Sequence, residues 1–302
     1  MPAKLNIHPE QLFMKSLSNI QNLNSKIQLY LPMIKSMQTG LLLATGMAGY
    51  LSAHTPFHLL VFLGLCASLF LSISGSTILN MWYDRDIDRV MDRTHNRPLA
   101  AGKIGQREAL RLGLILSAVG VAWAVAIQPL FGLVVFAGLF FDVVVYTIWL
   151  KRRTCWSIVW GGISGGMPIL AGRTLATGQI DLIGALLTMA VLFWIPTHIL
   201  TFSMRYFGDY QAAKVPTFPS TYSFETTRAI IALSAMIAAA SIGVAGVMIG
   251  VQAGSLRLMA VLSIGLLLLS FATIARPSER VNFGLFKYAS LYMLASMFLL
   301  AV

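Results

Sequence analysis

The most informative stretch of the chain reads Asn80-Met-Trp-Tyr-Asp84-Arg-Asp86-Ile-Asp88-Arg-Val-Met-Asp92-Arg-Thr-His-Asn-Arg97-Pro98. It follows a long apolar run and carries four carboxylates and four arginines. Its amide and acidic side chains recur every fourth residue from Asn80 to Asp92, so a helix would place them on one face. Carboxylates in this array suit Mg²⁺, which typically binds one or two protein carboxylates together with substrate phosphates. The arginines offer planar forks that match phosphate oxygens. The alternative is a solvated helix end, whose i,i+3 ion pairs would contribute only about 0.2–0.5 kcal/mol each.

The composition indicates a membrane protein. Apolar residues make up 57% of the chain, charged residues only 11%, and the mean hydropathy is +0.75, far from the soluble norm. We therefore expect an all-α integral membrane protein, a bundle of about nine transmembrane helices around a central cavity. The predicted spans are residues 34–53, 58–81, 109–127, 130–150, 158–171, 182–204, 229–251, 256–275 and 283–302, the fifth being short and rich in glycine.

The basic residues predict the orientation of this bundle. Of the 22 lysines and arginines, all but Arg173 and Arg257 lie in the N-terminal segment, in the connections after the second, fourth, sixth and eighth spans, or within the first five residues of the spans that these regions lead into. By the positive-inside rule these regions are cytoplasmic. We expect a cytoplasmic tail at 1–31 and a single transmembrane domain at 32–302. The net charge of +11 then describes one membrane face, which favours anionic lipid and diphosphate rather than nucleic acid.

A second charged connection follows the sixth span. It reads Arg205-Tyr-Phe-Gly-Asp209-Tyr210, with Lys214-Val-Pro216 shortly after. The even number of spans between the two charged connections places both on one face of the membrane. Together they can close a single polar site over a central cavity.

Several motifs resemble those of a known enzyme family. The pattern Asn80-x3-Asp84-x3-Asp88 resembles the first diphosphate motif of the UbiA superfamily of intramembrane prenyltransferases, and the longer string 84–99 looks like that of the protoheme IX farnesyltransferases. Further matching motifs follow in the family's order over about residues 80–228. They are Tyr146-Thr-x2-Leu-Lys151-Arg152-x-Thr154, Gly161-Gly-x2-Gly-Gly-x-Pro168, Trp194-x-Pro-x-His198 and Asp209-Tyr-x2-Ala-x-Val-Pro-x2-Pro219.

The resemblance implies a UbiA-like fold and a chemistry in which Mg²⁺ assists departure of the diphosphate from farnesyl diphosphate. The acceptor would be a vinyl group of heme b, and water addition would complete heme O. The implied metal ligands and catalytic residues are Asn80, Asp84, Asp88 and Asp209, and the implied substrate-binding residues are Arg93, Arg97, Lys151, Arg152, Tyr146 and His198. Membrane lipid surrounds such an enzyme in the cell (inner) membrane, with the active site open to the cytoplasm. A membrane partner in the heme pathway would be compatible with this role.

Some positions depart from the family pattern. Gly208 stands where an acid is usual, Arg173 where a tryptophan is usual, and Ile199 where an aromatic residue is usual. These departures leave open a UbiA-type enzyme for another acceptor, such as a quinone-ring precursor or a lipid glycerol. A non-catalytic transporter would need broken helices and polar groups deep in several spans. Two residues also allow two interpretations: His198 contacts porphyrin or only bonds across helices, and Asp142 is functional or merely hydrogen-bonded inside the bundle.

Overall fold

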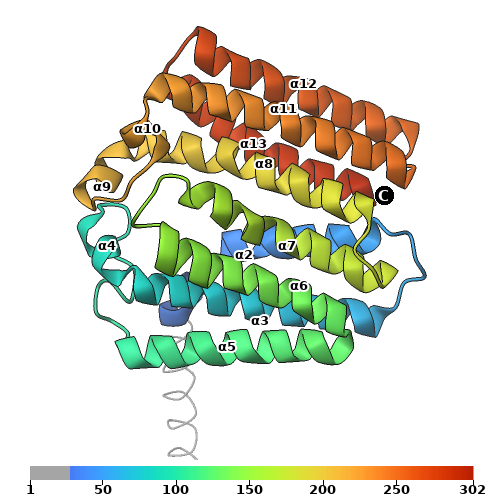
Figure 1. The fold of residues 1–302 in the computed structure, drawn as a ribbon, viewed down its shortest axis with the longest axis horizontal. Coiled ribbons are helices and arrows are strands. Elements are labelled where there is room, and N and C mark those ends of the chain that lie inside the picture. Colours follow the sequence, from blue (N-terminus) through green and yellow to red (C-terminus); the bar gives the residue numbers. More distant parts are fainter. Residues whose placement is uncertain (1–27, 302) are drawn as a thin grey trace, which may run out of the picture.

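The computed structural model describes residues 28–301, which contain helices and no strands. Most of the predicted tail at 1–31 therefore lies outside the described residues. Within them, nine long helices form one bundle, as the hydropathy predicted (Figure 1). Their bounds are α2 Ser36–Leu51, α3 Leu59–Tyr83, α5 Gln106–Ile127, α6 Pro129–Phe140 continued by η2 Phe141–Leu150, α7 Ser157–Thr177, α8 Leu182–Arg205, α11 Phe224–Ile249, α12 Ala253–Ala275 and α13 Glu279–Ala301.

Seven of these helices are individually long and apolar enough to cross a membrane. The two others are α2, which has only 16 residues, and the glycine-rich α7. Both pack inside the bundle against each other. The protein is thus a multi-pass membrane protein whose count of about nine crossings depends on these two helices.

Close packing of α2 against α7 rests on small residues on both helices. A Cβ atom at Gly172 would lie 1.9 Å from the carbonyl oxygen of Gly46, and one at Gly49 would lie 2.1 Å from that of Ile169. Only glycine permits backbones to approach so closely, which is a common device of helix contacts in membranes. The contact fixes α7 beside the cavity described below.

Four short helices complete the bundle: η1 Leu31–Ile34, α4 Arg85–Val90, α9 Phe207–Ala212 and α10 Phe218–Thr221. Figure 1 shows α4, α9 and α10 gathered at one end of the long helices. This end carries the two charged connections that the sequence placed on a common face. The backbone N–H of Arg93 donates to Asp209 Oδ2 at 3.3 Å, so the two connections touch.

Candidate active site

Asp84 lies at the junction between α3 and α4. Its backbone leaves helical geometry there, with φ −89° and ψ 7°. The helical hydrogen bonds nevertheless continue from Asp84 N to Asn80 O at 2.9 Å and from Asp88 N to Asp84 O at 2.8 Å. These three residues therefore stay on one side of the chain, as predicted. The predicted face does not extend to Asp92, because α4 ends at Val90 and Asp92 lies exposed in the following turn.

The Asp84 carboxylate is buried among cations, with its side chain 1% exposed. Lys151 Nζ donates to Oδ2, and Arg152 Nη2 lies 3.8 Å from Oδ1. That Oδ1 atom is buried and accepts no hydrogen bond within residues 28–301. A buried carboxylate oxygen without a donor is costly, and it is a hard oxygen ligand of the kind Mg²⁺ binds. Asp84 Oδ1 is therefore a candidate ligand for a divalent cation, beside the cationic side chains of Lys151 and Arg152.

The two neighbouring acids have opposite surroundings. Asp88 is buried, and Arg97 Nη1 donates to both of its carboxylate oxygens at 2.9 Å. The Asp86 side chain is 62% exposed, and the Arg152 guanidinium donates a hydrogen bond of 2.7 Å to each of its carboxylate oxygens. These hydrogen bonds lower the pKa of the Asp86 carboxyl to about 2. Asp86 is thus exposed where Asp84 and Asp88 are buried, and Arg152 Nη2 lies within 4 Å of both the Asp84 and the Asp86 carboxylate.

Asp209 belongs to the second connection and meets the first one at Arg93. It lies in α9 and accepts the hydrogen bond from the Arg93 backbone. The Arg93 guanidinium itself lies over the rings of Phe202 and Tyr206, at 4.7 and 5.5 Å from their centroids. No three acidic, histidine or cysteine side chains of residues 28–301 stand close enough to hold a metal alone. A cation here would share its ligands with substrate phosphates, as Mg²⁺ commonly does.

Asn80 connects this charged rim to the interior. Its Nδ2 donates to Thr147 Oγ1 at 2.8 Å, and its Oδ1 accepts from Lys35 Nζ at 3.3 Å. Sequence reasoning did not single out Lys35 as a site residue. A lysine at the start of an apolar span was the available indication, since an ammonium at that depth needs a partner.

A cavity of about 700 Å³ lies beneath the rim, among α2, α3, η2, α7, α8 and α13. Most of its lining is apolar, and two of the predicted substrate-binding residues, Tyr146 and His198, line it. The His198 ring is stacked between Trp194 and Phe286, at centroid distances of 4.9 and 4.4 Å. Its Nδ1 pairs with Ser290 Oγ at 3.1 Å. The structure thus places His198 in the cavity wall and also gives it a bond across helices.

The glycines of α7 serve this cavity as well as packing. Gly161 lines it and lies under Tyr146, because a Cβ at Gly161 would come within 2.7 Å of the Tyr146 ring. Gly166 instead faces α8, where a Cβ would meet the Thr188 side chain at 2.7 Å. Gly161 therefore borders the cavity, whereas Gly166 allows close packing between α7 and α8.

The three departures from the family pattern lie in different places. Arg173 is buried at the opposite end of the bundle, where it pairs with Asp181 at 2.7 Å and donates to the Ser52 carbonyl at 2.9 Å. Gly208 has nothing within 4 Å of an added Cβ. Only Ile199 lines the cavity. Two of the three positions thus lie away from the space where an acceptor would bind.

An apolar intramembrane cavity closed by paired acids and phosphate-matching cations defines a class of enzymes that act on membrane-soluble diphosphates. A model of the UbiA prenyltransferase family matches residues 41–296. The chain belongs to this family of prenyltransferases.

Within that family, the chain is similar to proteins described as protoheme IX farnesyltransferases. It is 42% identical over 202 residues to the one from Archaeoglobus fulgidus, which covers 66% of this chain and 70% of that protein. It is 33% identical over 276 residues to the one from Pyrobaculum islandicum, covering 90% and 98%.

Solved structures share the fold. A digeranylgeranylglyceryl phosphate synthase has a TM-score of 0.76 at 17% identity, covering 92% of this chain and 98% of that one. A UbiA homologue from Archaeoglobus fulgidus bound to DMAPP and Mg²⁺ has a TM-score of 0.68 at 17% identity, covering 91% and 99%.

Proposed function

We propose that this protein transfers the farnesyl group of farnesyl diphosphate to a vinyl group of heme b, forming heme O. The observation that carries the transfer chemistry is the buried Asp84 carboxylate at the charged end of the apolar cavity, whose Oδ1 accepts no hydrogen bond from residues 28–301. The choice of acceptor is supported by the similarity to protoheme IX farnesyltransferases over 90% of the chain.

The charged rim would hold the diphosphate. Asp84, Asp88 and Asp209, with Asn80 as a neutral oxygen ligand, are the residues that would hold Mg²⁺, which neutralises the charge that develops on a departing diphosphate. Arg93, Arg97, Lys151 and Arg152 lie around these acids and would bind the remaining diphosphate oxygens. Arg97 and Arg152 each form an ion pair with a carboxylate in this structure, so each would have to replace that carboxylate with a diphosphate oxygen.

The apolar cavity would protect the allylic cation from bulk water. Tyr146 lines the cavity just below Lys151, whose Nζ lies 5.6 Å from the tyrosine ring centroid. An aromatic face at this position stabilises a cation that forms as the C–O bond breaks. His198, stacked in the opposite wall, would contact the flat acceptor. The transfer needs no covalent intermediate with the enzyme.

We further propose that the charged end faces the cytoplasm, in the cell (inner) membrane. The basic residues of three connections meet at that end, which the positive-inside rule assigns to the cytoplasm. Surrounding lipid and any membrane partner that delivers heme would then meet the sides of the bundle.

The test is an assay of purified protein in lipid nanodiscs with Mg²⁺, farnesyl diphosphate and heme b. Mass analysis should find heme O, and chelation of the metal should abolish it. The second candidate is prenyl transfer to a quinone precursor or a lipid glycerol, for which the fold shared with digeranylgeranylglyceryl phosphate synthase is the supporting observation. Prenylation of such an acceptor, together with absence of heme O, would replace the first assignment with the second.

A further inference from the structure

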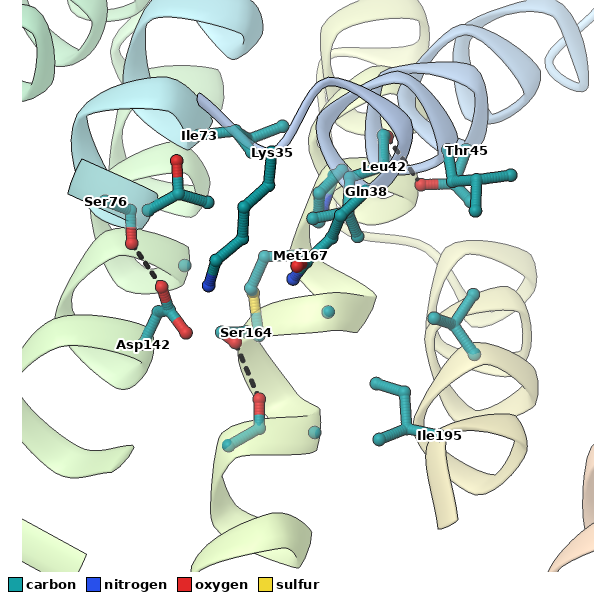
Figure 2. A pocket seen from close by; sticks show the side chains of 18 of the residues that line it. Lys35, Gln38, Leu42, Thr45, Ile73, Ser76, Asp142, Ser164, Met167 and Ile195 are labelled. Carbon is teal, nitrogen blue, oxygen red and sulfur yellow. Dashed lines mark hydrogen bonds between the residues drawn. The ribbon is translucent and has the colours of Figure 1, made fainter. Parts of the chain in front are cut away.

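Asp142 is an acid within the fourth membrane span that the proposed diphosphate site does not use. It lies in η2 and lines the cavity below the charged rim. Ser76 on α3 donates its hydroxyl hydrogen to Asp142 Oδ2, while no hydrogen bond within residues 28–301 reaches Oδ1 (Figure 2). Ionisable side chains inside membrane spans are costly and commonly functional. The second carboxylate oxygen of Asp142 thus remains available on the cavity side.

The unusual helix geometry of η2 sets the position of this acid. η2 is a π-helix, and Lys151 N bonds to Tyr146 O at 2.9 Å, five residues back. The Thr147 hydroxyl likewise donates to the Asp142 carbonyl at 2.7 Å. The wider turn brings Tyr146 and Lys151 to the helix face of Asp142, with Asp142 and Tyr146 in the cavity wall and Lys151 at the charged rim, whereas an α-helix would turn Lys151 away. Along one helix face, from the membrane interior to the charged rim, lie the Asp142 carboxylate, the Tyr146 ring and the Lys151 ammonium.

Lys35 approaches the same space from the start of α2. Figure 2 shows its ammonium and the Asp142 carboxylate pointing into a common part of the cavity. Lys35 Nζ already donates to Asn80 Oδ1, and it has three N–H donors in all. A buried water typically needs two to four polar partners. Asp142, Lys35 and Ser76 can supply them in a cavity that is otherwise mostly apolar.

The other hydroxyl groups of the cavity are poor bases for a further reaction. Ser164 donates to Gly161 O at 2.6 Å, and Thr45 donates to Leu42 O at 2.7 Å. Alcohols are also far weaker bases than a carboxylate. The remaining candidate is His198, whose Nδ1 is paired with Ser290 and whose ring faces are covered by two aromatic side chains. His198 Nε2 accepts no hydrogen bond from residues 28–301 and is the alternative base, but Asp142, with Ser76 and Lys35 beside it to hold a water, is the better placed proton acceptor.

We propose that Asp142 is a further catalytic residue, the base that takes a proton from the water added to the acceptor. This role rests on the proposed function. The diphosphate leaves with the electrons of its C–O bond, and the farnesyl carbon bonds to the outer vinyl carbon, which leaves positive charge on the inner vinyl carbon. The water oxygen bonds to that inner carbon, and one of its protons passes to the Asp142 carboxylate. Asp142 then returns the proton to solvent.

The test is the product ratio of Asp142→Asn, which keeps the shape of the side chain and removes the base. Without a base for water, the cation loses a proton from the neighbouring carbon, and the product is lighter than heme O by one water. We expect the ratio of hydrated to dehydrated product to fall on the order of a hundredfold, a usual contribution of a general base. Ser76→Ala should shift the ratio in the same direction and less far, and Asp142→Glu should restore part of the hydration.

Glu279→Gln is the matched control, because it makes the same acid-to-amide change at a side chain that is 77% exposed and outside the cavity. The Asp142 proposal is overturned if Asp142→Asn gives heme O at the wild-type rate and ratio, or if it abolishes both products. It is also overturned if His198→Gln, and not Asp142→Asn, yields the dehydrated product. Failure of the wild type to prenylate heme would instead refute the proposed function. If Asp142→Asn does not insert, the ratio for Ser76→Ala decides.

Discussion

Exchange of Asp84 for asparagine separates its chemical role from its packing role. Alanine would leave the Lys151 ammonium without its partner, and an unpaired buried charge costs roughly 3–5 kcal/mol of stability. Asparagine keeps an oxygen for Lys151 and removes the negative charge. The loss of attraction to Arg152, 3.8 Å away, is at most about 4 kcal/mol at an effective dielectric constant near 20, and less because Arg152 is one-third exposed. We expect an inserted, less stable protein.

Transfer by Asp84→Asn should slow on the order of a hundredfold, about 2.7 kcal/mol, because one anchor of a preorganised charge cluster is lost. Asp86→Asn is the matched comparison, two residues away, with a side chain that is 62% exposed. Its surface ion pair is worth about 1 kcal/mol or less, so its transfer rate should stay near the wild-type value. The assay is product formation in nanodiscs, with thermal unfolding measured on the same samples. Equal loss of transfer in both variants would refute the assignment of the catalytic role to the buried Asp84 rather than to the exposed Asp86.

Further changes test the packing, the far end and the orientation. Gly172→Ala should lower stability by roughly 1–3 kcal/mol, because its Cβ would clash with Gly46; Gly208→Ala, which meets nothing within 4 Å, is the control, and equal unfolding midpoints would contradict this contact. Asp181→Ala should lower the free energy of unfolding on the order of 3 kcal/mol by leaving buried Arg173 unpaired, with the acceptor preference unchanged; a changed preference would show that the far end shapes the site. Single cysteines at positions 95 and 252, in a chain without its two native cysteines, should be labelled from opposite sides of the membrane, and labelling of both from one side would disprove the orientation.

The sequence by itself determined the kind of protein. A run of about twenty apolar residues must satisfy its backbone hydrogen bonds internally in lipid, so it forms a helix wherever it occurs. Span number then places the connections alternately on two faces, which is why the contact between the Asp84 and Asp209 connections could be expected. The order of the motifs also indicated the family.

Only the tertiary structure decided which side chains meet. Apolar length shows that a span crosses the membrane, but its rotation and depth depend on packing against neighbouring helices. The pairing of Asp84 with Lys151, the approach of Lys35 to Asn80, and the separation of Arg173 from the cavity all depend on those two quantities. The π-helix that aligns Asp142 with Lys151 has no reliable pattern in the sequence, because widened turns change which residues share a face without changing their hydropathy. These contacts are fixed only when the long helices are assembled.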